Sequence, residues 1–170
     1  ISDTQGNPAV SSVLAKMAWA QRPNFLLHPG DLVSTGKNKD HWLNHFFPGM
    51  RPLIDRVAFF PVLGNHEQNA DHYYNYVSLP EPEYYYTFKY GNTQFFMVDT
   101  NQNVGVGSKQ YEWLKGELEN STATWKFVCH HHPPYSSDEN DYGDLWKSNK
   151  SSRGDMRARV LVPLYEDNAV

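Results

Sequence analysis

The sequence contains a single cysteine, Cys129, so no disulfide can form within the chain. This count leaves the compartment open, because secreted proteins need not be cross-linked, and a secreted or periplasmic location is our expectation. The chain begins Ile1-Ser2-Asp3, without a Met and without a segment that resembles a signal peptide. We therefore expect that processing or trimming removed the residues that would carry any targeting signal.

Long apolar runs and basic runs are also lacking. No stretch approaches the roughly 20 apolar residues that are needed to span a bilayer. The chain has 15 Lys and Arg against 19 Asp and Glu, a net charge of −4, and no basic cluster that could follow a phosphate backbone. Neither a membrane nor duplex nucleic acid is therefore expected as a partner, and the sequence leaves the oligomeric state open.

The 170 residues are 39% hydrophobic, which is enough for one core, and we expect one domain over residues 1–170. Helical and extended patterns alternate, which favours an α/β fold. Extended segments are predicted at 25–28, 58–63 and 125–130, with a hairpin formed by 84–90 and 94–99. Helices are predicted after Asn7-Pro8, after Ser108, and over 156–165, where Pro163 would end or kink the helix.

The first predicted helix carries an apolar stripe at helical spacing, and we expect that stripe to lie in the core. Its members are Val10, Val13, Leu14 and Met17.

Polar segments follow the predicted strands, where open α/β sheets usually bind ligands. These segments are Ser2-Asp3-Thr4-Gln5, Gly30-Asp31-Leu32-Val33, Gly64-Asn65-His66-Glu67 and His131-His132-Pro133-Pro134-Tyr135. Together they offer carboxylates, an amide oxygen and imidazoles, a mixed set that suits Zn, Mn or Fe. The glycines before Asp31 and Asn65 would let the backbone turn sharply at each strand end. The sequence therefore predicts a metal site at these strand ends.

These four segments, in this order, resemble the calcineurin-like metallophosphoesterases, and in particular the purple acid phosphatase-like branch. The resemblance implies a layered α/β/β/α sandwich, incomplete here at both ends, and two divalent or mixed-valence metal ions (Fe, Zn or Mn). It implies that Asp3 binds the first metal, that Asp31 bridges both, and that Asn65 and His131 bind the second. His66 would stand beside the leaving group as the catalytic residue.

Two neighbouring residues are expected to contact substrate oxygens, namely His132 and Tyr135. Of the three consecutive histidines, His131 is chosen as the ligand by its place before His-Pro-Pro-Tyr, and His130 is expected to be packed or hydrogen-bonded. His41 and His45 are spaced i, i+4, but the aromatic residues around them favour a packing helix over a zinc site.

The sequence departs from the family pattern at three places. Gln5 stands where the family has His or Gly, and its amide oxygen would compensate as a ligand. Ser34 stands where purple acid phosphatases have a metal-binding Tyr, so the protein is not expected to be purple with iron bound. The Gly-His-x-His motif has no counterpart, since no histidine follows His132. We interpret this as truncation and expect the 170-residue form to bind metal weakly and to turn over slowly.

The predicted function is a metal-dependent phosphoric ester hydrolase, with a phosphomonoester as the substrate and a metal-bridging hydroxide as the nucleophile for in-line attack. A phosphodiesterase would use the same dinuclear site. The altered positions Gln5 and Ser34 also leave a third alternative, a degenerate module that binds phosphate or a protein partner without turnover. The acidic residues between 138 and 144 are either a solvated loop or a lid beside the site.

Overall fold

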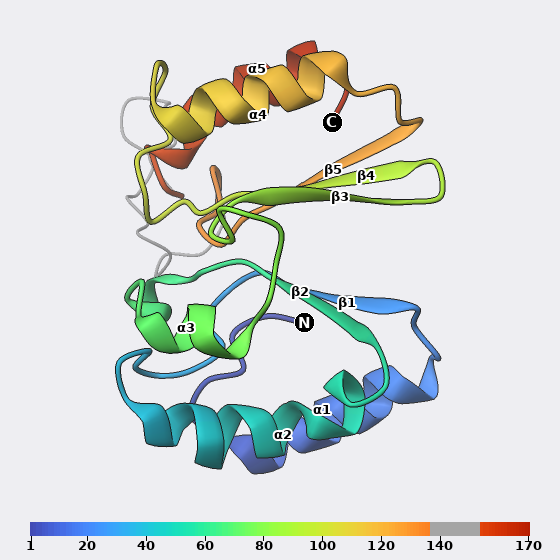
Figure 1. Ribbon diagram of the computed structural model, residues 1–170, viewed down its shortest axis with the longest axis vertical. Helices are drawn as coiled ribbons and strands as arrows, with labels where there is room; N and C mark the ends of the chain where they lie inside the picture. The colour runs from blue at the N-terminus through green and yellow to red at the C-terminus, as the bar shows by residue number, and fades with distance from the viewer. Residues whose placement is uncertain (137–153) are drawn as a thin grey trace. The chain divides into compact units, whose positions relative to one another are not determined.

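The computed structural model describes residues 1–136 and 154–170 and shows a mixed α/β fold, as predicted (Figure 1). The chain forms two compact units, Ile1–Glu83 and Tyr84–Val170. The expectation of one domain over residues 1–170 stays a prediction. The acidic stretch between 138 and 144 lies outside the described residues.

The first unit pairs two short parallel strands, with Phe25 opposite Ala58 and His28 opposite Pro61. Its elements are α1 (Pro8–Ala20), β1 (Phe25–His28), the π-helix η1 (His41–Phe46), α2 (Phe47–Ile54), β2 (Ala58–Pro61), the 3₁₀ turn η2 (Asn65–Glu67) and α3 (Asp71–Tyr76). As predicted, the Asn7 side chain caps α1, accepting a hydrogen bond from the backbone N–H of Val10. Figure 1 shows α1 and α2 side by side along one face of β1 and β2.

The expected core stripe of α1 is wrong. All four of its members are exposed, with 53% of Val10, 55% of Val13, 46% of Leu14 and 62% of Met17 accessible. The helix instead buries its small side chains, Ser11 and Ala15. A Cβ on Gly49 of α2 would lie only 3.1 Å from that of Ser11, so the two helices approach closely through small residues. Periodicity identifies residues that share a helix face but not which face is covered.

Aromatic side chains fill the core of the first unit. Trp42 and Phe46 of η1 are buried, and the Trp42 indole N–H donates to the Gly36 carbonyl over 2.8 Å. This confirms the prediction of a packing helix here. The His41 and His45 rings stack on each other at 5.1 Å between centroids.

The second unit is built on a sheet in the order β3-β4-β5, antiparallel between the first two strands and parallel between the last two. Its elements are β3 (Tyr86–Tyr90), β4 (Thr93–Met97), α4 (Lys109–Asn120), β5 (Trp125–Cys129), the 3₁₀ turn η3 (Ala158–Leu161) and α5 (Val162–Asp167). The predicted hairpin and the helix capped by Ser108 are both confirmed. Pro163 lies in the first turn of α5, where its missing N–H is harmless, so it begins a helix and does not end one.

Figure 1 shows α4 and α5 together on one face of this sheet. The buried cluster between them joins Phe96 and Val98 to Leu114, Leu118, Leu161 and Leu164. Among the described residues, no helix is both long enough and apolar enough to cross a membrane.

Candidate metal centre

Asp3 and Asp31 lie at the ends of two neighbouring extended segments. The backbone N–H of Asp3 donates to the Gly30 carbonyl (3.2 Å) and that of Thr4 to the Asp31 carbonyl (3.0 Å), so the first residues run beside the end of β1. Both aspartates adopt left-handed backbone conformations, with φ of 55° and 56°. Such conformations are unfavourable for residues other than glycine and collect at functional sites, where the surrounding structure maintains them.

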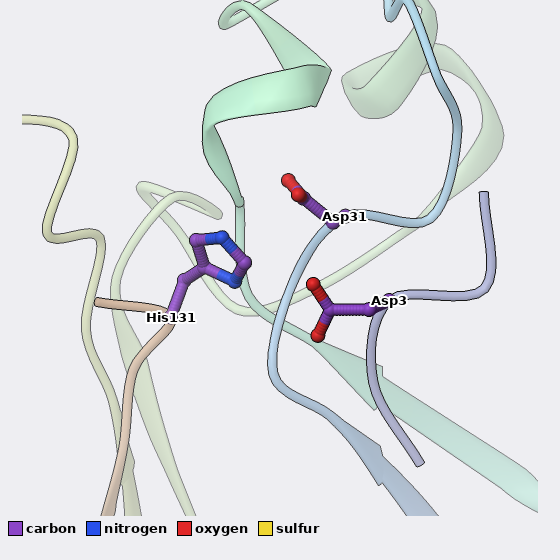
Figure 2. Close-up of side chains that lie close together, drawn as sticks. All are labelled: Asp3, Asp31 and His131. Atoms are coloured by element: carbon purple, nitrogen blue, oxygen red, sulfur yellow. The ribbon is translucent and has the colours of Figure 1, made fainter. Parts of the chain in front are cut away.

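The two carboxylates extend to the same side of these segments, and one oxygen of each lies within 4.8 Å of the other (Figure 2). Asp31 is buried, whereas Asp3 is exposed and accepts a short hydrogen bond from the Ser2 hydroxyl. Like charges at this separation repel each other, and a cation between them removes the repulsion. The first unit therefore presents a pair of oxygen donors suited to a metal ion.

Gln5 lies against the same pair. Its Nε2 donates to Asp31 Oδ2 over 3.3 Å, and its Oε1 is buried without a hydrogen-bond partner. A buried amide oxygen without a partner is costly, and a bound cation would satisfy it. The predicted role of Gln5 as a ligand through its amide oxygen stays a prediction.

The loop after β2 brings His66 beside Asp31. The His66 backbone N–H donates to Asp31 Oδ1 over 3.0 Å, and its ring Nε2 lies 3.8 Å from Asp31 Oδ2. Ring atom Nδ1 is 2.8 Å from the Ser34 carbonyl, which can only accept, so Nδ1 carries a hydrogen and Nε2 is the exchangeable position. The side chain is 41% exposed and can therefore reach a ligand from solvent. Asn65, the neighbouring predicted ligand, is also exposed.

Glu67 ends this loop and was given no role from the sequence. Its side chain is fully buried, and its carboxylate accepts four backbone N–H groups, from Asp31, Leu32, Val33 and Gly64. Burial raises the pKa of Glu67 to about 7, although the hydrogen bond from the Gly64 N–H acts in the opposite direction. Glu67 is the last residue of the Gly-Asn-His-Glu segment, but that position alone does not reveal what its carboxylate contacts.

The two glycines before Asp31 and Asn65 serve different purposes. Gly30 has a φ of 91°, as a sharp turn requires. Gly64 has an ordinary extended backbone, with a φ of −97°, so the predicted turn is not the reason for this glycine. A Cβ there would lie 2.1 Å from Asp31 Oδ1 and 2.4 Å from Asp31 N, so the position admits no side chain at all.

In the second unit, His131 follows β5 in the loop that leads to Tyr135. Figure 2 also labels His131. As predicted, His130 is hydrogen-bonded and packed: its Nδ1–H donates to the His132 carbonyl (3.0 Å), and its ring stacks on Tyr165. Burial lowers the pKa of His130.

His132 is buried and held by hydrogen bonds. Only 2% of this residue is exposed, its Nδ1 lies 2.7 Å from the Thr100 hydroxyl, and its backbone N–H donates to the same hydroxyl (3.2 Å). Burial lowers the pKa of His132 to about 4, so the ring is neutral at neutral pH. This environment favours a structural role, and the expected substrate contact stays a prediction.

Tyr135, the other predicted substrate contact, is 60% exposed. The Arg159 guanidinium lies 4.6 Å from its ring centroid and donates through Nε to the Pro134 carbonyl over 2.7 Å. The ring therefore has a fixed cationic neighbour and an open face.

The sequence model of the calcineurin-like phosphoesterase family matches residues 1–162. No curated protein gives a significant match. Among solved structures, the chain is similar to a purple acid phosphatase isolated from yellow lupin (Lupinus luteus) seeds, with a TM-score of 0.77 and 16% identity.

That similarity covers 99% of this chain but only 35% of the lupin chain, so this chain spans about a third of its relative. The structural match confirms the predicted metallophosphoesterase fold. The family match covers nearly the whole chain and includes all four polar segments at the strand ends. The chain therefore belongs to the calcineurin-like phosphoesterase family.

Proposed function

We propose that the chain carries the ligands of a dinuclear metal site in a phosphoric ester hydrolase, with a phosphomonoester as the substrate. The pair of carboxylates on Asp3 and Asp31 is the observation that carries this proposal. Both residues have a left-handed backbone conformation, and one carboxylate oxygen of each lies within 4.8 Å of the other. The buried, unpaired Oε1 of Gln5 beside them fits a cation in the same way.

Asp3 would bind the first metal, Asp31 would bridge both, and Asn65 would bind the second. We assign His131 to the second metal from its place before His132-Pro133-Pro134-Tyr135, the segment that matches the family motif. Gln5 would add an amide oxygen. Carboxylate, amide and imidazole ligands together suit Zn, Mn or Fe. When bound, such ions act as Lewis acids on the phosphoryl group and lower the pKa of a bound water to a value near neutrality.

The residues of the chain have separate tasks in the reaction. The hydrogen bond from Nδ1 to the Ser34 carbonyl fixes the His66 ring, so that Nε2 remains to hold a proton. Protonated Nε2 would donate to the leaving oxygen of the ester. The Asp31 carboxylate oxygen Oδ2 lies 3.8 Å from this nitrogen. Exposed Tyr135 would contact oxygens of the substrate.

Equilibrium dialysis of the 170-residue chain against Mn²⁺ and Zn²⁺ tests the proposal, with hydrolysis of an aryl phosphate and a bis-aryl phosphate measured on the same samples. We expect metal binding in the wild-type chain and its loss in Asp31→Asn. Asp40→Asn is the matched control, because Asp40 is exposed and its side chain makes no capping hydrogen bond.

Faster turnover of the monoester supports a phosphomonoesterase, and faster turnover of the diester would instead identify a phosphodiesterase. Metal binding without turnover of either ester would favour the non-catalytic module. If Asp31→Asn binds as much metal as the wild type, the assigned site is wrong.

A further inference from the structure

Glu67 lies where two loops of the first unit meet. One loop follows β1 and carries Asp31, and the other follows β2 and carries Asn65 and His66. Glu67 Oε2 accepts the N–H of Asp31 over 2.8 Å and that of Gly64 over 2.6 Å. A single oxygen therefore ties the backbone of one loop to the backbone of the other.

The second oxygen extends the contact along the first loop. Oε1 accepts the N–H of Leu32 over 2.8 Å and that of Val33 over 3.3 Å. These amides lie beyond the paired residues of β1 and β2, so no strand carbonyl accepts their hydrogen bonds in the sheet. The Glu67 carboxylate accepts them instead. Successive N–H groups arranged in this way form a concave site for an anion. The Glu67 carboxyl group thus occupies a site lined by N–H donors of the ligand loop.

A carboxylate suits this position better than an amide of the same shape. The Glu67 carboxyl group is met by four backbone N–H donors, and each of its oxygens accepts two of these hydrogen bonds. A glutamine has only one acceptor oxygen, so in either orientation its NH₂ group would face two N–H donors. Hydrogen bonds to an ionised acceptor are also the stronger ones.

We infer that Glu67 is a positioning residue for the metal site, an inference that rests on the proposed function. Its hydrogen bond fixes the backbone of Asp31 in the left-handed conformation, with φ of 56°, in which an oxygen of the carboxylate lies within 4.8 Å of one of Asp3. Its link to Gly64 sets the distance between Asp31 and the loop of Asn65 and His66. Glu67 itself contacts neither metal nor substrate.

The test compares Zn²⁺ and Mn²⁺ affinity, measured by calorimetric titration, in the wild-type chain and in Glu67→Gln. Residues that orient metal ligands typically change metal affinity about 10–100-fold when replaced, and we expect a loss in that range. Far-UV circular dichroism monitors the fold. Leu53→Ala is the control, because Leu53 is buried in α2, outside the site, and its loss lowers stability without touching the ligand loops.

Unchanged affinity in Glu67→Gln would overturn the inference, and so would an equal loss of affinity in Leu53→Ala. If Glu67→Gln does not fold, amide hydrogen exchange in the wild-type chain decides the question. The amides of Asp31, Leu32 and Gly64 should then exchange slowly and together, and exchange at the rate of exposed loops would refute the link. If the wild-type chain binds no metal, the proposed function fails, while the exchange measurement still tests whether Glu67 joins the loops.

Discussion

Replacing Gly64 with alanine should force apart the two loops that carry Asp31 and Asn65. The new Cβ would lie 2.4 Å from the backbone nitrogen of Asp31, whereas ordinary contacts begin near 3.4 Å. The carboxylate oxygen at 2.1 Å can rotate away, but the nitrogen cannot, so the two loops must separate by about 1 Å. Overpacking of this kind costs about 1–3 kcal/mol, and a clash with backbone belongs at the upper end.

Thermal unfolding followed by circular dichroism measures this cost. For a chain of this length about 1 kcal/mol shifts Tm by roughly 2–4 °C, so Gly64→Ala should melt about 6–12 °C below the wild type. Metal affinity should fall as well, because the separation of the loops moves Asp31 away from Asn65.

Gly116→Ala provides the matched control. Gly116 lies inside α4, and a Cβ there would meet nothing within 4 Å. Alanine is the better helix former by about 0.5–1 kcal/mol, so this variant should melt about 1–4 °C above the wild type. The same added methyl group should therefore act with opposite sign at the two positions. A Gly64→Ala chain that melts at or above the wild-type temperature would refute the close approach of the two loops.

The packing of α1 and the state of the thiol give two further predictions. Met17→Ser, at an exposed position, should change the free energy of unfolding by less than about 0.5 kcal/mol. Ala15→Leu, at a buried position, should lower it by about 1–3 kcal/mol. Urea titrations that rank the two variants the other way would contradict the exposure of the apolar stripe. Burial raises the pKa of Cys129 to about 11, so at pH 8 only about one thiol in a thousand is ionised, against roughly a quarter for an unshifted thiol. Alkylation by iodoacetamide should therefore be at least about 100-fold slower in the native chain than in urea and should rise about tenfold per pH unit, and equal native and unfolded rates would disprove this burial.

The sequence alone determined the elements whose signals are local. Asn7 and Ser108 cap the helices that follow them, and Gly91 makes the turn of the hairpin, because each acts on backbone groups a few residues away. The order of the four polar segments also identified the family, since loops at strand ends supply the ligands of such sites.

Burial was decided only by the tertiary structure. The apolar stripe of α1 and its small residues Ser11 and Ala15 occupy different faces of one helix, and the sequence could not say which face α2 would cover. That choice depends on the close approach of two helices at Gly49, which lies far from α1 along the chain.

The same limit explains why Glu67 was missed and why Gly64 was misread. A glutamate next to two predicted ligands has no visible role until the fold places Asp31, Leu32 and Val33 around its carboxylate. The need for glycine at 64 likewise comes from a backbone more than 30 residues away, at Asp31. The sequence determined which donor groups the segments at the strand ends offer, because side-chain chemistry is local. The fold decided which of them meet and what holds them, because that depends on contacts between distant segments.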